Sequence, residues 1–140
     1  MSASFTKFQP FVEAVAEKKH NLGSDTLKVM LTLTAPVAAN AVKADLTEIA
    51  SGNGYTAGGT AANIVSSAQT SGTYKLVLDD VVFTASGGAI AAFRYAVLYN
   101  DTATNDELIG FWDRGASTTL LDGDTFTANF DGTTGVLQLA

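Results

Sequence analysis

Two apolar segments joined by a polar loop span residues 89–114, and they constrain the fold more than any other part of the sequence. The first segment, 90–99, has apolar side chains at both odd and even positions, which is typical of a central strand covered on both faces. The loop 100–106 is rich in Asn, Asp and Thr, which stabilise turns by bonding their own backbone. The return segment, 107–113, contains Leu108, Ile109, Phe111 and Trp112. Since each large buried side chain contributes roughly 1.5–3 kcal/mol, this hairpin is predicted to anchor the core.

A helical pattern precedes the hairpin at residues 8–19, where apolar side chains recur with the 3.6-residue period. They are Phe8, Phe11, Val12, Val15 and Ala16. Pro10 is tolerated only in the first turn of such a helix. His20 is expected to cap the carboxyl end, which Gly23 then closes. A helix this short is marginal alone in water, so its apolar face must dock, and we favour the sheet of the same chain over a neighbouring subunit.

From about residue 26 onward the apolar period changes to two. Leu27, Val29, Leu31 and Leu33 alternate with Lys28, Met30 and Thr32, which predicts a strand with one buried face. Further strands are predicted at 60–67, 73–78, 125–130 and 136–139, with a glycine-rich loop at 51–59, a long turn region at 79–88, and either a short helix or irregular backbone at 40–49. Short strands separated by regular turn signals predict a single β-rich domain over residues 1–140. Its expected class is mainly β, an antiparallel β-sandwich or barrel-like domain with one short N-terminal α-helix.

Composition excludes several kinds of site and partner. The chain has no cysteine, which excludes disulfides, thiolate metal sites and cysteine nucleophiles. Its net charge is −6, and the acids are concentrated in residues 100–140, so no nucleic-acid partner is expected. The first residues contain no continuous apolar core of a signal peptide, and no apolar run approaches the ~18 residues of a membrane span, so no membrane partner is expected.

Acidic and glycine-rich motifs are better explained by turns than by ligands. Asp122, Asp124 and Asp131 resemble calcium ligands, but the next alternate position after Asp124 is Phe126 and no closing Glu follows, so no metal site is predicted. Asp79 and Asp80 are neighbours whose side chains are expected to diverge rather than act as an acid–base pair. The loop 51–59 lacks the following helix and lysine that a phosphate cradle needs.

Two isolated residues could carry chemistry, and each has a structural explanation. His20 is the sole histidine, and a hydrolase triad would need it beside a hydroxyl and a carboxylate. Arg94 lies in the most apolar strand, where an unpaired guanidinium would be costly. We therefore expect its face to open to solvent, or an ion pair with Asp113 or Glu107. No catalytic, cofactor-binding or metal site is predicted, and no enzymatic activity is expected.

Four segments, residues 5–36, 47–59, 93–115 and 122–140, resemble small virion structural proteins of tailed bacteriophages and prophages. The resemblance implies a non-enzymatic assembly component and favours a capsid decoration, or cement, protein that binds and stabilises the assembled head. It implies the major capsid protein as partner, a homo-oligomer such as a trimer, and a place on the capsid surface after assembly in the host cytoplasm. The alternatives are a tail or fibre component that binds another virion protein or a host receptor, and a carbohydrate-binding module with Trp112 and Tyr99 as its stacking surface.

Overall fold

The computed structural model describes residues 5–130, 132 and 135–139. Its elements are, in chain order, β1 (Phe5–Lys7), α1 (Gln9–Ala16), β2 (Leu27–Thr32), the 3-10 helix η1 (Lys43–Asp45), β3 (Thr60–Ala62), β4 (Ile64–Thr70), β5 (Thr73–Leu78), β6 (Val81–Thr84), β7 (Ile90–Asn100), β8 (Leu108–Leu120), β9 (Thr125–Ala128) and β10 (Leu137–Leu139). They form a five-stranded sheet of order β1-β8-β7-β2-β3, a three-stranded sheet β10-β5-β4 and a pair β6-β9, all antiparallel. The predicted class, mainly β, antiparallel and sandwich-like with one N-terminal α-helix, is confirmed.

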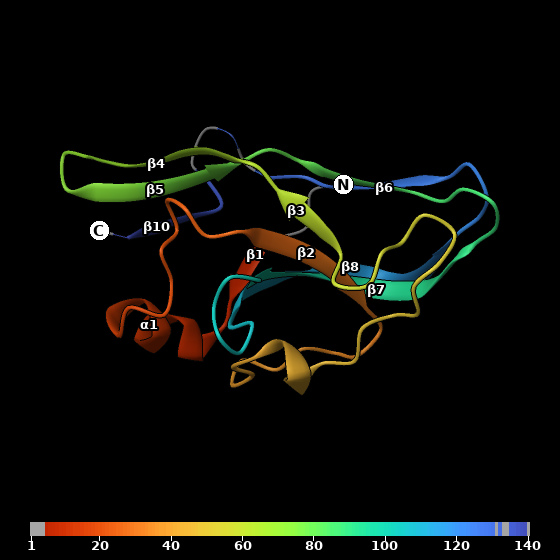
Figure 1. Ribbon diagram of the computed structural model, residues 1–140, viewed down its shortest axis with the longest axis horizontal. Helices are drawn as coiled ribbons and strands as arrows, with labels where there is room; N and C mark the ends of the chain where they lie inside the picture. The colour runs from red at the N-terminus through yellow and green to blue at the C-terminus, as the bar shows by residue number, and fades with distance from the viewer. Residues whose placement is uncertain (1–4, 131, 133–134, 140) are drawn as a thin grey trace.

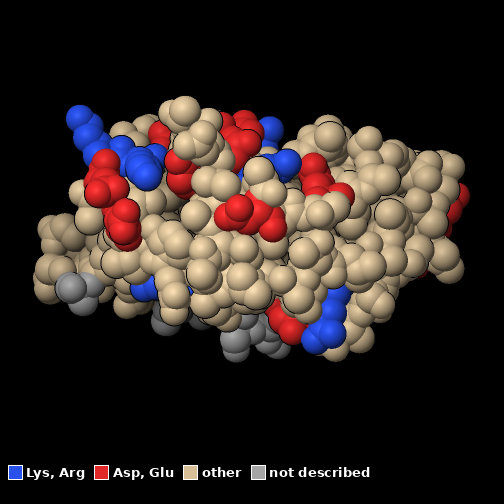
Figure 2. Space-filling view, turned by 90° about the horizontal axis from the view of Figure 1, so that it is seen from below, with Lys and Arg blue, Asp and Glu red and all other residues tan. Residues whose placement is uncertain are grey.

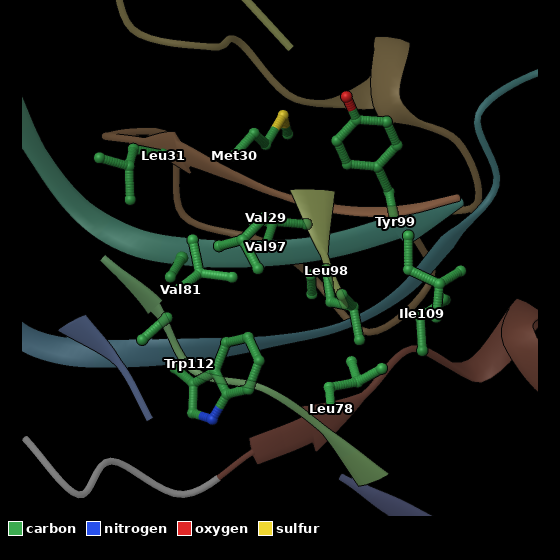
Figure 3. Packing of buried hydrophobic residues seen from close by; sticks show 14 of the residues in the cluster. Val29, Met30, Leu31, Leu78, Val81, Val97, Leu98, Tyr99, Ile109 and Trp112 are labelled. Carbon is green, nitrogen blue, oxygen red and sulfur yellow. The ribbon is translucent and has the colours of Figure 1, made fainter. Parts of the chain in front are cut away.

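The sheets are stacked in layers around the long β7–β8 hairpin. Figure 1 shows the two smaller sheets on one side of the five-stranded sheet, and α1 with the segment 33–50 on its other side. Directly opposite residues of paired strands share a face, so Met30 and Val97 lie on one face and Val29 and Leu98 on the other. All four are fully buried. The close-up in Figure 3 shows Met30 and Tyr99 on one side of the sheet, and Trp112 with Leu78 on the other.

The prediction that β2 has one buried face is therefore wrong. Met30 and Thr32 are 0% exposed, like Val29 and Leu31, because α1 and the segment 33–50 cover the face that was expected to meet water. Leu33 lies beyond the end of the strand and is 53% exposed. The two-sided burial predicted for 90–99 is found in its second half, from Tyr95 onward, where the same layers enclose β7.

The helix differs from its prediction in length and in orientation. It covers only Gln9–Ala16 and ends where Lys18 takes a left-handed conformation (φ 68°), so Gly23 does not close it. Phe8 and Phe11 are buried in the parent chain, which confirms docking on the same chain, but Val12 is 55% exposed and Ala14 is buried in its place. The strand β1 before the helix, paired with β8, is not predicted by the sequence.

Strand boundaries in the second quarter of the chain also differ. The predicted strand 60–67 is two strands, because β3 pairs with β2 whereas β4 pairs with β5 in another sheet. The chain crosses between the sheets at Asn63, whose backbone oxygen and side chain both bond Asp79. The region 79–88, predicted as a long turn, contains β6, whose short alternation buries Val81 and Phe83 and exposes Val82.

Candidate functional site

A cleft of about 890 Å³ opens at the end of the molecule where α1 ends. Its walls come from three parts of the chain: the segment 15–25, the loop 102–107, and residues of β4, β5 and β10. Its polar lining includes His20, Asp25, Ser67, Tyr74 and Glu107. A volume of this size is within the range of ligand pockets, so the cleft is the first place to look for binding or chemistry.

Asn100, the last residue of β7, is fully buried and joins two walls of the cleft. Its Nδ2 donates to Oδ2 of Asp25 at 2.7 Å and to Nδ1 of His20 at 3.0 Å. Its Oδ1 accepts the backbone N–H groups of Thr102 and Ala103 at 2.9 and 3.1 Å. One side chain thus holds the loop after β7 and the segment 20–25 in fixed positions. Buried polar groups stabilise a fold when they are fully hydrogen-bonded in this way.

His20 is a buried neutral side chain, not the helix cap that the sequence predicts. It is 9% exposed, and its ring packs on Phe11 with the ring centres 5.1 Å apart. Because Nδ1 accepts from Asn100, the proton of the neutral ring is on Nε2, which has no hydrogen-bond partner in the described part of the chain. Burial lowers the pKa of His20 below its ordinary value, although the carboxylates of Glu107 and Asp25 act in the opposite direction.

The cleft does not assemble a nucleophile and its base. The acceptor nitrogen of His20 is already occupied by Asn100, so it is not free to take a proton from a hydroxyl. The hydroxyls of Ser67 and Tyr74 bond each other at 2.6 Å instead. Asp25 accepts from Asn100 and from the backbone N–H of Asn21. These contacts position the walls of the cleft.

The state of His20 predicts a pH-dependent stability. A lowered pKa in the folded protein means that the unfolded chain binds the proton more readily, so the contribution of His20 is complete above its unfolded value of about 6.5 and is lost as the pH falls toward the folded value. The free energy of unfolding should decrease as the pH is lowered from 7 to 5, as measured by urea denaturation. The facing groups are Glu107, Asp25, Lys19 and the amide of Asn100.

The matched control is His20→Asn, whose side-chain oxygen can accept from Asn100 without titrating. This variant should show a flatter profile between pH 7 and 5. An equally steep decrease in both proteins would assign the pH dependence to other groups.

The glycine-rich loop 51–59 is confirmed as a loop, and it is fastened to the body of the protein by a second polar cluster. Oε2 of Glu48 accepts the hydroxyl of Tyr55 and the N–H of Gly58, both at 2.6 Å, and Tyr99 donates its hydroxyl to the carbonyl of Gly58. Tyr55 is 2% exposed, and its hydroxyl oxygen also accepts the N–H of Leu31. Because a carboxylate of the protein itself occupies the N–H of Gly58, that group is not available to cradle a phosphate.

The other candidate residues lie apart from the cleft. Asp79 and Asp80 diverge as expected, since Asp79 accepts from Asn63 and Asp80 accepts the N–H of Phe130. Asp122 accepts the backbone N–H of Gly87, and Asp124 accepts that of Leu121 in its own turn. Asp131 lies outside the described residues. No cluster of three His, Asp or Glu side chains that could hold a metal ion occurs among the residues that the structure describes.

Arg94 lies in an ion pair at the surface, whereas the aromatic rings of Trp112 and Tyr99 are buried. Arg94 forms a two-point ion pair with Asp113, at 2.8 and 3.1 Å, as predicted, and both side chains are about two-fifths exposed. Trp112 and Tyr99 are only 7% and 1% exposed, so the alternative of a carbohydrate-binding module that stacks on these two rings is wrong: both rings belong to the core. Figure 2 shows acidic and basic side chains interspersed over one half of the face it presents, without a continuous basic surface there.

Asn100 and Glu48, which organise the two polar clusters, were not predicted. The signal for Asn100 is its place directly after the most apolar strand, where the sequence alone indicates only a turn former. No helix in the described part of the chain is long and apolar enough to cross a membrane.

Comparison with protein-family models, with curated proteins and with solved structures finds no match to this chain.

Proposed function

We propose that this protein is a non-enzymatic structural component of a bacteriophage virion, and specifically a capsid decoration protein. It binds the assembled head and stabilises it. Its partner is the major capsid protein on the outer surface of the shell, and neither nucleic acid nor membrane takes part. The resemblance of its segments to small phage virion proteins supplies the biological setting.

The observation that carries the proposal is that buried and half-buried polar side chains hold two surface loops in fixed positions. Glu48 and Tyr99 fasten the loop 51–59, and Asn100 fastens the loop after β7. A loop that is already held in one conformation loses little entropy on binding, so more of its contact energy contributes to affinity. Such preorganised loops suit a protein that acts by docking.

Decoration stabilises a shell by mass action. A protein that binds the assembled lattice but not free subunits adds stability that rises with its concentration and affinity. Copies gathered around a three-fold position of the shell would form a trimer, since closed symmetry is the usual arrangement of identical subunits. The loops 51–59 and 100–106 reach the neighbouring capsid subunits in this proposal.

We expect the heads of virions lacking this protein to break open at a lower temperature or a milder osmotic shock than the heads of normal virions. Adding the purified protein back should restore the resistance. A reconstruction of the intact particle should then place its density on the head surface. The measurement is release of packaged DNA during a heat ramp.

Two variants with the same substitution at exposed alanines test which surface is used. Ala57→Glu places a bulky charge in the loop 51–59, whereas Ala116→Glu places it on β8. Only Ala57→Glu should restore resistance poorly. The decoration role would be rejected, and a tail or fibre component favoured, by either of two results. One is density of this protein confined to the tail. The other is that heads of virions lacking this protein are as robust as normal heads.

A further inference from the structure

The strand β4 (Ile64–Thr70) forms an open edge of the three-stranded sheet. It pairs with β5 on one side and lies at the end of the strand order β10-β5-β4. In Figure 1 it runs along the margin of the molecule. An unpaired edge presents a row of N–H and C=O groups that can template pairing with another chain.

The register of the β4–β5 hairpin shows which backbone groups point outward. Ser71 and Gly72 form a two-residue turn with left-handed conformations (φ 52° and 87°), so Thr70 and Thr73 are the hydrogen-bonded pair that closes it. Because bonded and non-bonded pairs alternate, Ala68 bonds Lys75. The N–H and C=O groups of Ser67 and Gln69 therefore face away from β5, and no backbone bond to either residue is found on that side among the described residues.

The edge lacks the usual protection against pairing. Ile64–Thr70 contains no charged residue and no proline, and Ser66, Ala68, Gln69 and Thr70 are exposed. The irregularity in its pairing is confined to its first residues, between Ile64 and Ser66, so the stretch 66–70 is regular. Charged side chains or a bulge along residues 66–70 would prevent another strand from pairing with this edge, and neither is present there.

The lengths of the other free edges identify the matching strand. The described edge strands β1, β3 and β10 have three residues each, and β6 and β9 have four. β4 has seven. The strand in this chain that matches the whole length of the β4 edge is another copy of β4.

We propose that two copies of this protein pair antiparallel through β4 across a two-fold axis. Ala68 faces Ala68 of the second copy on the axis, and the outward groups of Ser67 bond those of Gln69 of the second copy in both directions. This register uses the regular stretch 66–70 and leaves no outward group of Ser67 or Gln69 unpaired. The two three-stranded sheets become one continuous sheet, and this two-fold contact is made in addition to the three-fold contact of the proposed trimer. Edge pairing alone buries less than the ~1,200 Å² of a stable interface, so the free dimer is weak.

Single cysteines test this register, because the chain has no cysteine of its own. In the proposed dimer, Ala68→Cys puts two thiols at a non-hydrogen-bonded pair with Cα atoms about 4.5 Å apart, which suits a disulfide. Thr70→Cys is the control: it is equally exposed and on the same face of β4, but the two copies of residue 70 are about 14 Å apart. Both purified variants are oxidised in a glutathione buffer and analysed by non-reducing electrophoresis, with circular dichroism to verify folding.

We expect Ala68→Cys to become predominantly a covalent dimer while Thr70→Cys stays predominantly monomeric. The wild-type protein should also show a concentration-dependent rise in mass by sedimentation equilibrium. Equal and slow dimer formation by both variants overturns the proposal, since it reports random collision. Faster coupling of Thr70→Cys than of Ala68→Cys overturns it as well. Because the assay uses the free protein, its outcome is independent of the decoration role.

Discussion

Phe11→Ala is expected to lower the free energy of unfolding by about 3–5 kcal/mol, the usual cost of truncating a fully buried Phe. Phe11 is 1% exposed and lies between the sheet and His20, with its ring centre 5.1 Å from the imidazole. Its removal leaves a cavity beside His20, which lines the cleft. Urea denaturation followed by circular dichroism measures the change.

Val12→Ala is the matched control because Val12 is the next residue of the same helix and is 55% exposed. Substitutions at exposed positions away from special features change stability by roughly 0.5 kcal/mol or less. A loss at Val12 as large as that at Phe11 would mean that the helix presents the other face to the sheet. Retained stability in Phe11→Ala would mean that the helix contributes little to the fold of the free chain.

The contrast between these neighbours shows where helical periodicity stops being informative. Phe8, Phe11 and the exposed Val12 all fit a 3.6-residue pattern, and hydrophobicity ranks Val12 above the small Ala14. The structure buries Ala14 instead, and the chain enters the helix from Phe8, whose N–H bonds the carbonyl of Ile109 in β8. The existence of the helix is thus predictable from local pattern, whereas its orientation involves packing on a strand that is distant in the sequence.

Pairings within a hairpin were likewise easier to predict than contacts between distant segments. Arg94 and Asp113 lie on β7 and β8, two neighbouring strands joined by one loop; Asp113 is paired with Tyr95, and the irregular register between Phe93 and Tyr95 places Arg94 beside it. The burial of Met30 on the second face of β2 requires the segment 33–50 to fold back over the sheet. The alternating pattern of β2 contains no signal for that cover.

The candidate site was not predicted because its parts are far apart in sequence. The hydrogen bonds of Asn100 reach Asp25 and His20, which precede it by 75 and 80 residues. Turn formation explains an Asn in a polar loop equally well. Composition therefore does not distinguish a buried Asn that bonds several segments from an exposed Asn in a turn. Glu48 fell in the segment 40–49, for which sequence allowed either a helix or irregular backbone.

Asn100→Ala is expected to destabilise the protein by about 1–3 kcal/mol, the cost of leaving one buried polar group, here Nδ1 of His20, without its partner. The N–H groups of Thr102 and Ala103 lose their acceptor, and Asp25 loses a donor at 2.7 Å. The loop after β7 should loosen, and hydrogen exchange of the amides of 102 and 103 should accelerate. Denaturation in urea at pH 7 measures the loss of stability.

The control is Asn105→Ala, an exposed asparagine in the same loop whose side chain forms no hydrogen bond in the described part of the chain. It should change stability by roughly 0.5 kcal/mol or less. A second measurement distinguishes the hydrogen bonds of Asn100 from a role in packing alone. Asn100 donates to Nδ1 of the neutral ring, so its removal withdraws a bond that favours the neutral form, and the pKa of His20 should rise toward its ordinary value in an NMR titration. If stability falls but His20 titrates as in the wild type, Asn100 acts through packing alone; if neither changes, the two walls of the cleft are held by other contacts.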